Sequence, residues 1–260
     1  MRLLKEHPMK KHVLVALAAA QLALLSVTAL AQEVPKHLKL AREFLVNTQP
    51  EDNLYVDKGN MYVKAPSDVF SSKYVVHTDC KGFVAEMIDR TYKYTPHFST
   101  RQFKNAYSIT DWLDGAVRGE VFNVVPSMAD VKVGDVIMWK YLVPPKYAPT
   151  HRGHIMIVNE APVRMDSSRL DGAIQWKVRV LDSSGAHSRD DTRYVPGMSV
   201  EKAGDTGASD QKRSGVGEGT IYIYTNDQGS IVAASHGFSK STINMQNATW
   251  FTIAARLNKS

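Results

Sequence analysis

The feature that most constrains the fold is a change in hydrophobic period near Val121. Before this residue, apolar side chains recur at the spacing of amphipathic helices. After it, apolar and polar residues alternate, as in strands with one buried face. Helices followed by a run of strands predict an α+β chain with an antiparallel sheet. The predicted helices cover residues 34–47, 80–88, 101–107 and 109–118, and the predicted strands cover residues 131–139, 153–159, 174–182, 219–225, 230–235 and 250–256.

Residues 1–31 have the pattern of a secretory signal peptide. A basic stretch precedes an apolar run from Val13 to Leu30, and Ala29-Leu30-Ala31 forms a small-x-small exit. We expect cleavage before Gln32, which makes the mature protein periplasmic or secreted. The alternative is an uncleaved membrane anchor, because the run nearly reaches the length that spans a bilayer. No later segment is apolar enough for stable membrane insertion.

Charge and cysteine content argue against a nucleic-acid-binding protein and against a domain stabilised by disulfides. Cleavage removes four basic residues and one acidic residue, which leaves 28 Lys and Arg against 25 Asp and Glu, a net charge of +3. These charges are scattered rather than clustered, so no nucleic-acid partner is expected. A single cysteine cannot form an internal disulfide, so the stability of an exported chain must come from a hydrophobic core.

The mature chain is long enough for one domain, residues 32–260. No internal repeat or sharp change in composition marks a second domain. Residues 183–217 are rich in Ser, Gly, Asp and charged residues, which predicts a long surface loop. A loop of this length is uncommon unless it is functional or mobile. It is either a lid over a substrate site or an insertion without a role.

Cys80, the only cysteine of the chain, is predicted to begin a helix. Four apolar residues follow it at helical spacing, namely Phe83, Val84, Met87 and Ile88. The thiol therefore faces the core side of the helix. The partial positive charge and free N–H groups of a helix N-terminus favour a thiolate, so this position predicts a nucleophile. The alternative is a buried structural cysteine.

A cysteine nucleophile needs a base, and His154 is the best-placed of nine histidines. Histidine suits this role because its pKa lies near neutrality. Strand alternation places His154 on one face with Met156 and Val158, and we expect the Cys80 helix to pack on that face. The alternatives are a histidine satisfied by backbone groups at a strand end, and His151 as the base.

The base is usually oriented by a polar group that accepts a hydrogen bond from its second ring nitrogen. Asp182 ends the predicted strand 174–182 on its apolar face, in one row with Val178 and Val180. A carboxylate buried there needs a partner, and a histidine on a neighbouring strand is suitable. Alternatively, Asp182 only ends the strand and starts a turn. In that case His187 is the orienting residue.

Three motifs follow one another along the chain: Asp-Cys-x-Gly-Phe-Val at residues 79–84, Val-Gly-Asp-Val-Ile-Met-Trp at 133–139 and Gly-His-Ile-Met-Ile-Val at 153–158. In this order they resemble the NlpC-like branch of the papain-like cysteine peptidases, often met as cell-wall hydrolases. The resemblance implies a papain-like fold, with N-terminal helices packed on an antiparallel sheet and the nucleophile at a helix N-terminus. It implies Cys80 as nucleophile, His154 as base and Asp182 as orienting residue. Lys81 departs from the small residue usual after the cysteine.

The function implied by the resemblance is an exported cysteine hydrolase of amide bonds, acting on peptidoglycan stem peptides or a related peptide. We expect a monomer that needs no metal or other cofactor, because one cysteine and dispersed histidines lack the familiar zinc-ligand spacings. Two alternatives have different outcomes. One is a non-catalytic envelope-binding protein or inhibitor on the same fold. The other is an acyltransferase that uses the same Cys–His pair.

Overall fold

The structure is a computed structural model, and it describes residues 33–56, 61–69, 71–96, 108–142, 153–194, 214–235, 243–246 and 250–258. The predicted signal peptide, the predicted helix 101–107 and His151 lie outside these ranges. The chain divides into two compact units, Met1–Glu33 and Val34–Ser260. The described helices and strands all belong to the second unit.

Three α-helices form in the described ranges: α2 (Lys36–Asn47), α3 (Cys80–Tyr92) and α4 (Ile109–Val117). Each turns an apolar face into the core, as the helical spacing predicts. Two short 3-10 helices, η1 (Pro50–Asp52) and η2 (Met128–Asp130), occur in connections. Among the described helices, none combines the length and the apolar character that crossing a bilayer requires.

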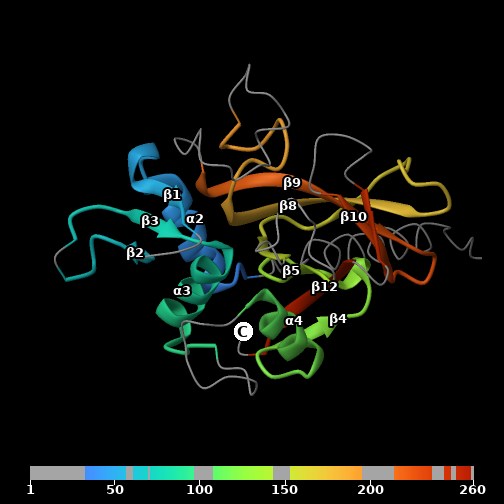
Figure 1. Ribbon diagram of the computed structural model, residues 1–260, viewed down its shortest axis with the longest axis horizontal. Coiled ribbons are helices and arrows are strands. Elements are labelled where there is room, and N and C mark those ends of the chain that lie inside the picture. Colours follow the sequence, from blue (N-terminus) through green and yellow to red (C-terminus); the bar gives the residue numbers. More distant parts are fainter. Residues whose placement is uncertain are drawn as a thin grey trace, which may run out of the picture. The chain divides into compact units, whose positions relative to one another are not determined.

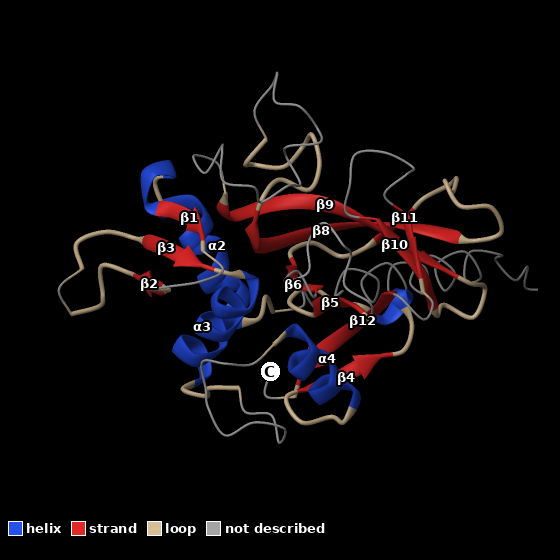
Figure 2. Cartoon of the chain, viewed as in Figure 1, coloured by secondary structure: helices blue, strands red, loops and turns tan. Residues whose placement is uncertain are grey.

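The strands of the described residues form two sheets (Figures 1 and 2). In the small sheet, β3 (Val75–Thr78) lies between β1 (Asn53–Tyr55), which is parallel to it, and β2 (Tyr62–Lys64), which is antiparallel. The large sheet has the order β11-β10-β9-β8-β6-β5-β12-β4, with β7 added on β8, and its pairs are antiparallel. Its strands are β4 (Phe122–Val125), β5 (Val136–Tyr141), β6 (Gly153–Val158), β7 (Val163–Arg164), β8 (Ile174–Ser184), β9 (Gly215–Thr225), β10 (Ile231–Ser235), β11 (Ile243–Met245) and β12 (Trp250–Leu257).

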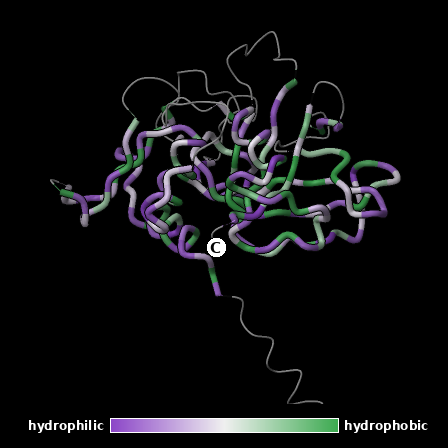
Figure 3. The backbone as a smooth tube through the Cα atoms, turned by 90° about the horizontal axis from the view of Figure 1, so that it is seen from below, coloured by the Kyte–Doolittle hydropathy of each residue, from purple (hydrophilic) through white to green (hydrophobic). Residues whose placement is uncertain are grey.

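The large sheet buries both of its faces. On one face, Ile155 and Ile157 of β6 pack in a cluster with residues of all three helices. On the other face, Met156 and Val158 pack in a second cluster with residues of β8, β9 and β12. The sheet curls around this second cluster, because β10 contacts β12 although four strands lie between them in the sheet order. Figure 3 shows hydrophobic and hydrophilic stretches following one another along the backbone.

The predicted papain-like α+β fold is wrong. The described chain is mostly β-sheet, with 12 strands in two sheets against three α-helices. The predicted antiparallel sheet is present, but the helices do not form the layer that a papain-like fold requires. Residues 50–76 lack a clear period, so the sequence predicts a loop or short strands there, and the structure forms the small sheet from strands of three or four residues each. Strands this short show no alternation.

The predicted loop 183–217 is also partly strand. The β8 strand continues through Ser184, and β9 begins at Gly215, so each of these strands has 11 residues. Residues 185–194 connect onward from β8 as turns, and residues 195–213 lie outside the described ranges. The two strands pair along their whole length, from Ile174 opposite Thr225 to Ser184 opposite Gly215.

Candidate active site

Cys80 is the first residue of α3 and follows directly on β3 and the N-cap residue Asp79. The Oδ1 atom of Asp79 accepts a hydrogen bond from the backbone N–H of Gly82 at 2.7 Å. The cap satisfies one of the free N–H groups of the helix start, where the partial positive charge stabilises an anion. The Cys80 side chain is buried, with 3% of the residue exposed. The predicted helix start at the sulfur is thus observed.

Gly82 lets α3 begin close against β3. A Cβ atom at this position would lie 2.1 Å from the Oγ1 atom of Thr78, which is too close for any side chain. The backbone carbonyl of Thr78 accepts a hydrogen bond from the Ser183 hydroxyl at 2.8 Å, which joins the end of β3 to β8. The glycine of the Asp-Cys-x-Gly motif therefore brings Cys80 beside the strand that carries Asp182.

Lys81, the departure from the small residue expected after Cys80, forms an ion pair with Asp79. The Asp79 side chain is buried, and the Lys81 side chain is partly exposed. A carboxylate next to Cys80 disfavours a thiolate, and the ammonium group of Lys81 offsets that charge. Lys81 is therefore compatible with a nucleophile at Cys80.

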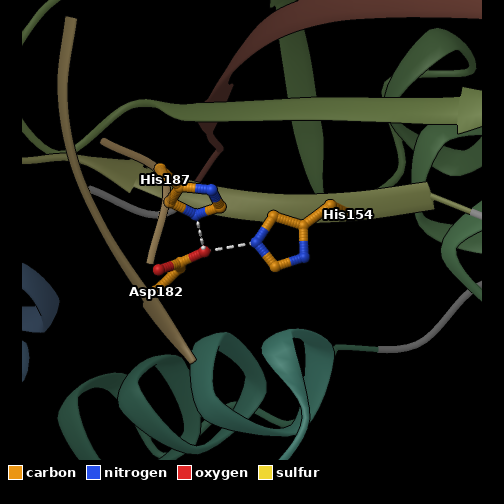
Figure 4. Close-up of side chains that lie close together, drawn as sticks. All are labelled: His154, Asp182 and His187. Carbon is orange, nitrogen blue, oxygen red and sulfur yellow. Dashed lines mark hydrogen bonds and ion pairs between the residues drawn. The ribbon is translucent and has the colours of Figure 1, made fainter. Parts of the chain in front are cut away.

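His154 lies near the start of β6 and is buried. Its Nε2 atom forms a hydrogen bond with Oδ2 of Asp182, and the neighbouring side chain of Cys80 is among the groups that raise the pKa of the His154 ring. Because Nε2 faces Asp182, Nδ1 is the nitrogen left for Cys80. Figure 4 shows one ring nitrogen directed at Asp182 and the other directed away from it. The structure thus brings the three predicted site residues together.

The face of the sheet that carries His154 differs from the predicted one. Alternation groups His154 with Met156 and Val158, but these residues pack on the face away from the helices. The ring of His154 also contacts Trp139 of that face, with ring centroids 6.0 Å apart. Its position near the start of β6 nevertheless allows the ring to reach the start of α3.

Asp182 is fully buried near the end of β8, and both of its carboxylate oxygens accept hydrogen bonds. Oδ2 accepts from His154, from His187 at 2.6 Å and from the Ser184 hydroxyl at 2.9 Å. Oδ1 accepts from the guanidinium of Arg193 at 2.9 Å. These four donors replace the water that the carboxylate loses on burial.

His187, the predicted substitute for Asp182, is instead a second partner of the same carboxylate (Figure 4). Its ring is edge-on to that of His154, with the centroids 5.5 Å apart. Nε2 of His154 donates its hydrogen bond to Asp182. Asp182 is therefore the residue that orients His154, and His187 binds the same oxygen of that carboxylate.

Charge at the site favours an imidazolium beside a carboxylate. Burial disfavours the protonated ring, but the charges of Cys80 and Asp182 and the hydrogen bonds to both raise the pKa of His154 from 6.5 to about 10. Burial likewise disfavours a charged Asp182, but the charges of His187, Arg193 and His154 hold the pKa of this carboxyl well below its usual range. The ring of His154 therefore carries a positive charge beside Asp182 at neutral pH.

The cluster of His154, Asp182 and His187 also has the composition of a metal site, since one ligand atom from each lies within 4.8 Å of the others. Two imidazoles and one carboxylate are ligands of zinc and iron enzymes. Here, both Nε2 atoms share one oxygen of Asp182, and Arg193 occupies the other. A guanidinium this close to the carboxylate repels a second cation. We therefore interpret the cluster as a hydrogen-bonded one.

Arg193 and its partner Asp191 are the site residues that the sequence does not reveal. Both are buried, although they lie in a segment whose composition predicts an exposed loop. The signal that points to them is the pair of glycines at residues 217 and 219 of β9, where a Cβ atom would meet Arg193 and Asp191. Glycine inside a strand marks a place where another group approaches the backbone closely.

Comparison with known proteins adds one relative. The chain is 26% identical over 196 residues to Uncharacterized protein R653 of Acanthamoeba polyphaga mimivirus, an alignment that covers 71% of this chain and 79% of the relative. No family model matches the chain. No solved structure matches it either.

Proposed function

We propose that this protein is an exported cysteine hydrolase that cleaves amide bonds, with peptidoglycan stem peptides or a related envelope peptide as substrate. The observation that carries the proposal is the pair of groups that act on His154: Asp182 accepts a hydrogen bond from its Nε2 atom, and Cys80 is close enough to raise its pKa. Nucleophilic catalysis requires a base that contacts the nucleophile and is oriented by a third group. The helix N-terminus at Cys80 supports the same role.

In the first half of the proposed reaction, His154 holds the proton of Cys80 and the thiolate attacks the carbonyl carbon of the substrate. The oxygen becomes an oxyanion, and the backbone N–H of Cys80 at the helix start is placed to donate to it. The tetrahedral intermediate then collapses and the C–N bond breaks. His154 gives its proton to the leaving amine, and a thioester to Cys80 remains.

In the second half, neutral His154 removes a proton from water, and the hydroxide attacks the thioester carbonyl. The C–S bond breaks, the product leaves as a carboxylic acid, and the thiolate–imidazolium pair is restored. Asp182 stays ionised and holds the ring through Nε2 in both halves. An amine in place of water would give acyl transfer, so the acceptor decides between hydrolase and acyltransferase.

The choice of substrate rests on the motifs and on the N-terminal segment. The Asp-Cys-x-Gly and Gly-His motifs occur in the order found in NlpC-like enzymes, which supports a cell-wall peptide. The signal-like residues 1–31 support delivery to the envelope. This likeness concerns the order of the reactive residues and does not extend to a papain-like fold.

The test is to incubate residues 32–260 with muropeptides and follow the products by liquid chromatography and mass spectrometry. We expect cleaved stem peptides with the wild type, and none with Cys80→Ala or His154→Gln. Asp190→Asn is the matched control, because Asp190 pairs with Arg179 on the surface and should leave turnover unchanged. A parallel reaction with added glycine amide detects acyl transfer.

The other outcomes each overturn the proposal. Turnover that survives Cys80→Ala and stops with a chelator would assign the His154, Asp182 and His187 cluster to a metal. Muropeptide binding that Cys80→Ala leaves intact, with no product from the wild type, would make the protein a binding protein. Retention of residues 1–31 in the protein isolated from cells would contradict cleavage before Gln32.

A further inference from the structure

The segment that follows β8 folds back and places a buried ion pair against the end of that strand. Asp191 and Arg193 are 5% and 4% exposed. The Arg193 guanidinium binds Asp191 through two hydrogen bonds of 2.8 Å, from Nε to Oδ1 and from Nη2 to Oδ2. This two-point contact fixes the plane of the guanidinium. Its third nitrogen, Nη1, is then directed at β8.

The Nη1 atom of Arg193 meets the end of β8 at several points. It donates to Oδ1 of Asp182 at 2.9 Å, to the Ser184 hydroxyl at 3.0 Å and to the carbonyl of Gly215 at 2.9 Å. With Oδ1 held in this way, Oδ2 is the oxygen that faces His154. The rotation of the Asp182 carboxylate is therefore set from the side opposite the base.

Two glycines of β9 provide the space for this ion pair. A Cβ atom at Gly217 would lie 2.3 Å from Nε of Arg193, and one at Gly219 would lie 2.2 Å from Oδ2 of Asp191. Gly217 is also the residue directly opposite Asp182 in the pairing of β8 with β9. The space for the ion pair is thus part of the sheet and lies directly opposite Asp182.

Burial of a charged arginine is costly, and a well-packed apolar side chain is often at least as stabilising as a buried ion pair. A purely structural role therefore explains this arrangement poorly. Asp191 also accepts a hydrogen bond from the backbone N–H of His187 at 2.9 Å, so the same pair positions the second histidine of the cluster.

We propose that Arg193 is a positioning residue for the reaction at Cys80: seated between Asp191 and Gly217, it holds Oδ1 of Asp182 so that Oδ2 orients His154. The inference rests on the proposed function, because it assigns Arg193 a role in that same site. Arg193 acts through Asp182 and His154 and touches neither the sulfur nor the substrate.

The test compares Arg193→Lys with Arg179→Lys, a matched control on the same sheet. Arg179 pairs with Glu218 and Asp190, away from the site. Lysine keeps the charge of Arg193 but loses the two-point contact. We expect Arg193→Lys to lower kcat on the muropeptide about 100-fold, the usual cost of a small misplacement at a reacting centre. KM should stay within threefold, and Arg179→Lys should leave both constants unchanged.

Gly217→Ala is a second variant that reaches the same contact without changing a charge. Its methyl group should displace Arg193 and reproduce the loss of kcat. The rate of Cys80 alkylation by iodoacetamide gives a readout that needs no substrate, and it should fall in both variants. Thermal unfolding of each variant establishes the folded fraction to which rates are referred.

Three results separate the failure of the inference from that of the proposed function. Normal kcat and alkylation in folded Arg193→Lys, with activity lost in Cys80→Ala, would overturn the positioning role alone. Lower thermal stability with unchanged kcat per folded molecule would make Arg193 purely structural and overturn it as well. Turnover that persists in Cys80→Ala would overturn the proposed function first.

Discussion

At the scale of single residues, the site depends on one imidazole that has a different partner on each nitrogen. Asp182 accepts a hydrogen bond from His154, and the neighbouring Cys80 also raises the pKa of the ring, so the imidazole carries a proton where the proposed reaction would use one. Each partner alone would favour an imidazolium. The two together raise the pKa of His154 to about 10 although the ring is buried.

This charge coupling predicts how His154 titrates. In the wild type, we expect nuclear magnetic resonance of labelled histidine to show His154 protonated up to a pH of about 10. In Cys80→Ala the pKa should fall, because one of the two anionic partners is gone. His37 is an internal control, since burial lowers its pKa and Cys80 is not among the causes of that shift. An unchanged titration of His154 in Cys80→Ala would contradict the coupling.

The residues of the site differ in how far the sequence reveals them. Cys80, His154 and Asp182 are recognisable because each lies at the end of a periodic element, where a polar side chain interrupts an apolar row. Arg193 and Asp191 have no such frame. Their burial depends on a turn that returns to β9, so no pattern in their own segment encodes that contact, and its only sign in the sequence is the glycine pair 217 and 219 of β9.

At the scale of elements, the junction between β3 and α3 fixes the position of the sulfur. The Asp79 cap, the close approach of Gly82 to Thr78 and the Ser183 hydrogen bond all lie within this junction. None of these contacts involves the thiol itself. The junction can therefore be altered without removing a reactive group.

The close approach at Gly82 predicts a double-mutant result. Alanine favours a helix over glycine by about 1 kcal/mol, yet Gly82→Ala should lower the free energy of unfolding by about 1–3 kcal/mol because its methyl group meets Thr78. Adding Thr78→Ala removes the clashing Oγ1 atom and should recover part of the loss. Urea unfolding of both single variants and the double variant measures the coupling. Strict additivity of the two substitutions would contradict the packing argument.

The sequence predicts those strands that are long enough for the apolar–polar alternation to repeat. The strands β5, β6, β8, β9, β10 and β12 have five or more residues, and each coincides with a predicted strand. The strands of the small sheet have at most four residues, which is too few for an alternation to define their bounds. The prediction of which row of β6 faces the helices is also wrong. A strand buried on both faces is apolar in both rows, so alternation does not distinguish them. The sequence could not show which row the helices cover.

At the scale of the whole molecule, two of the site residues lie on strands of the large sheet, so their charge state affects the stability of the fold. The partners His154 and Asp182 lie on the neighbouring strands β6 and β8, and Arg193 fastens the β8–β9 pair next to them. The protonated state of His154 that the proposed reaction uses is also the state that the folded protein stabilises. Stability and the charge state of the site should therefore change together with pH.

The linkage has a definite sign for His154. Its pKa is about 10 in the folded protein against 6.5 for the free side chain, so the folded state binds the proton more tightly. The resulting stabilisation is fully present below pH 6.5 and is lost as the pH rises through about 10. We expect urea unfolding to show a steeper loss of stability over this range in the wild type than in His154→Gln. Equal slopes for the two proteins would contradict the raised pKa.

The central claim, a reactive Cys80–His154 pair, is tested most directly by the rate of Cys80 alkylation against pH. Iodoacetamide reacts with the thiolate, and an ordinary thiol of pKa about 8.5 is only about 1% thiolate at pH 6.5. Because the chain has one cysteine, mass spectrometry assigns the product without ambiguity. We predict rapid alkylation at pH 6.5 in the wild type and a large decrease in His154→Ala. A slow rate that rises with pH like that of an ordinary thiol, and that His154→Ala leaves unchanged, would contradict the claim.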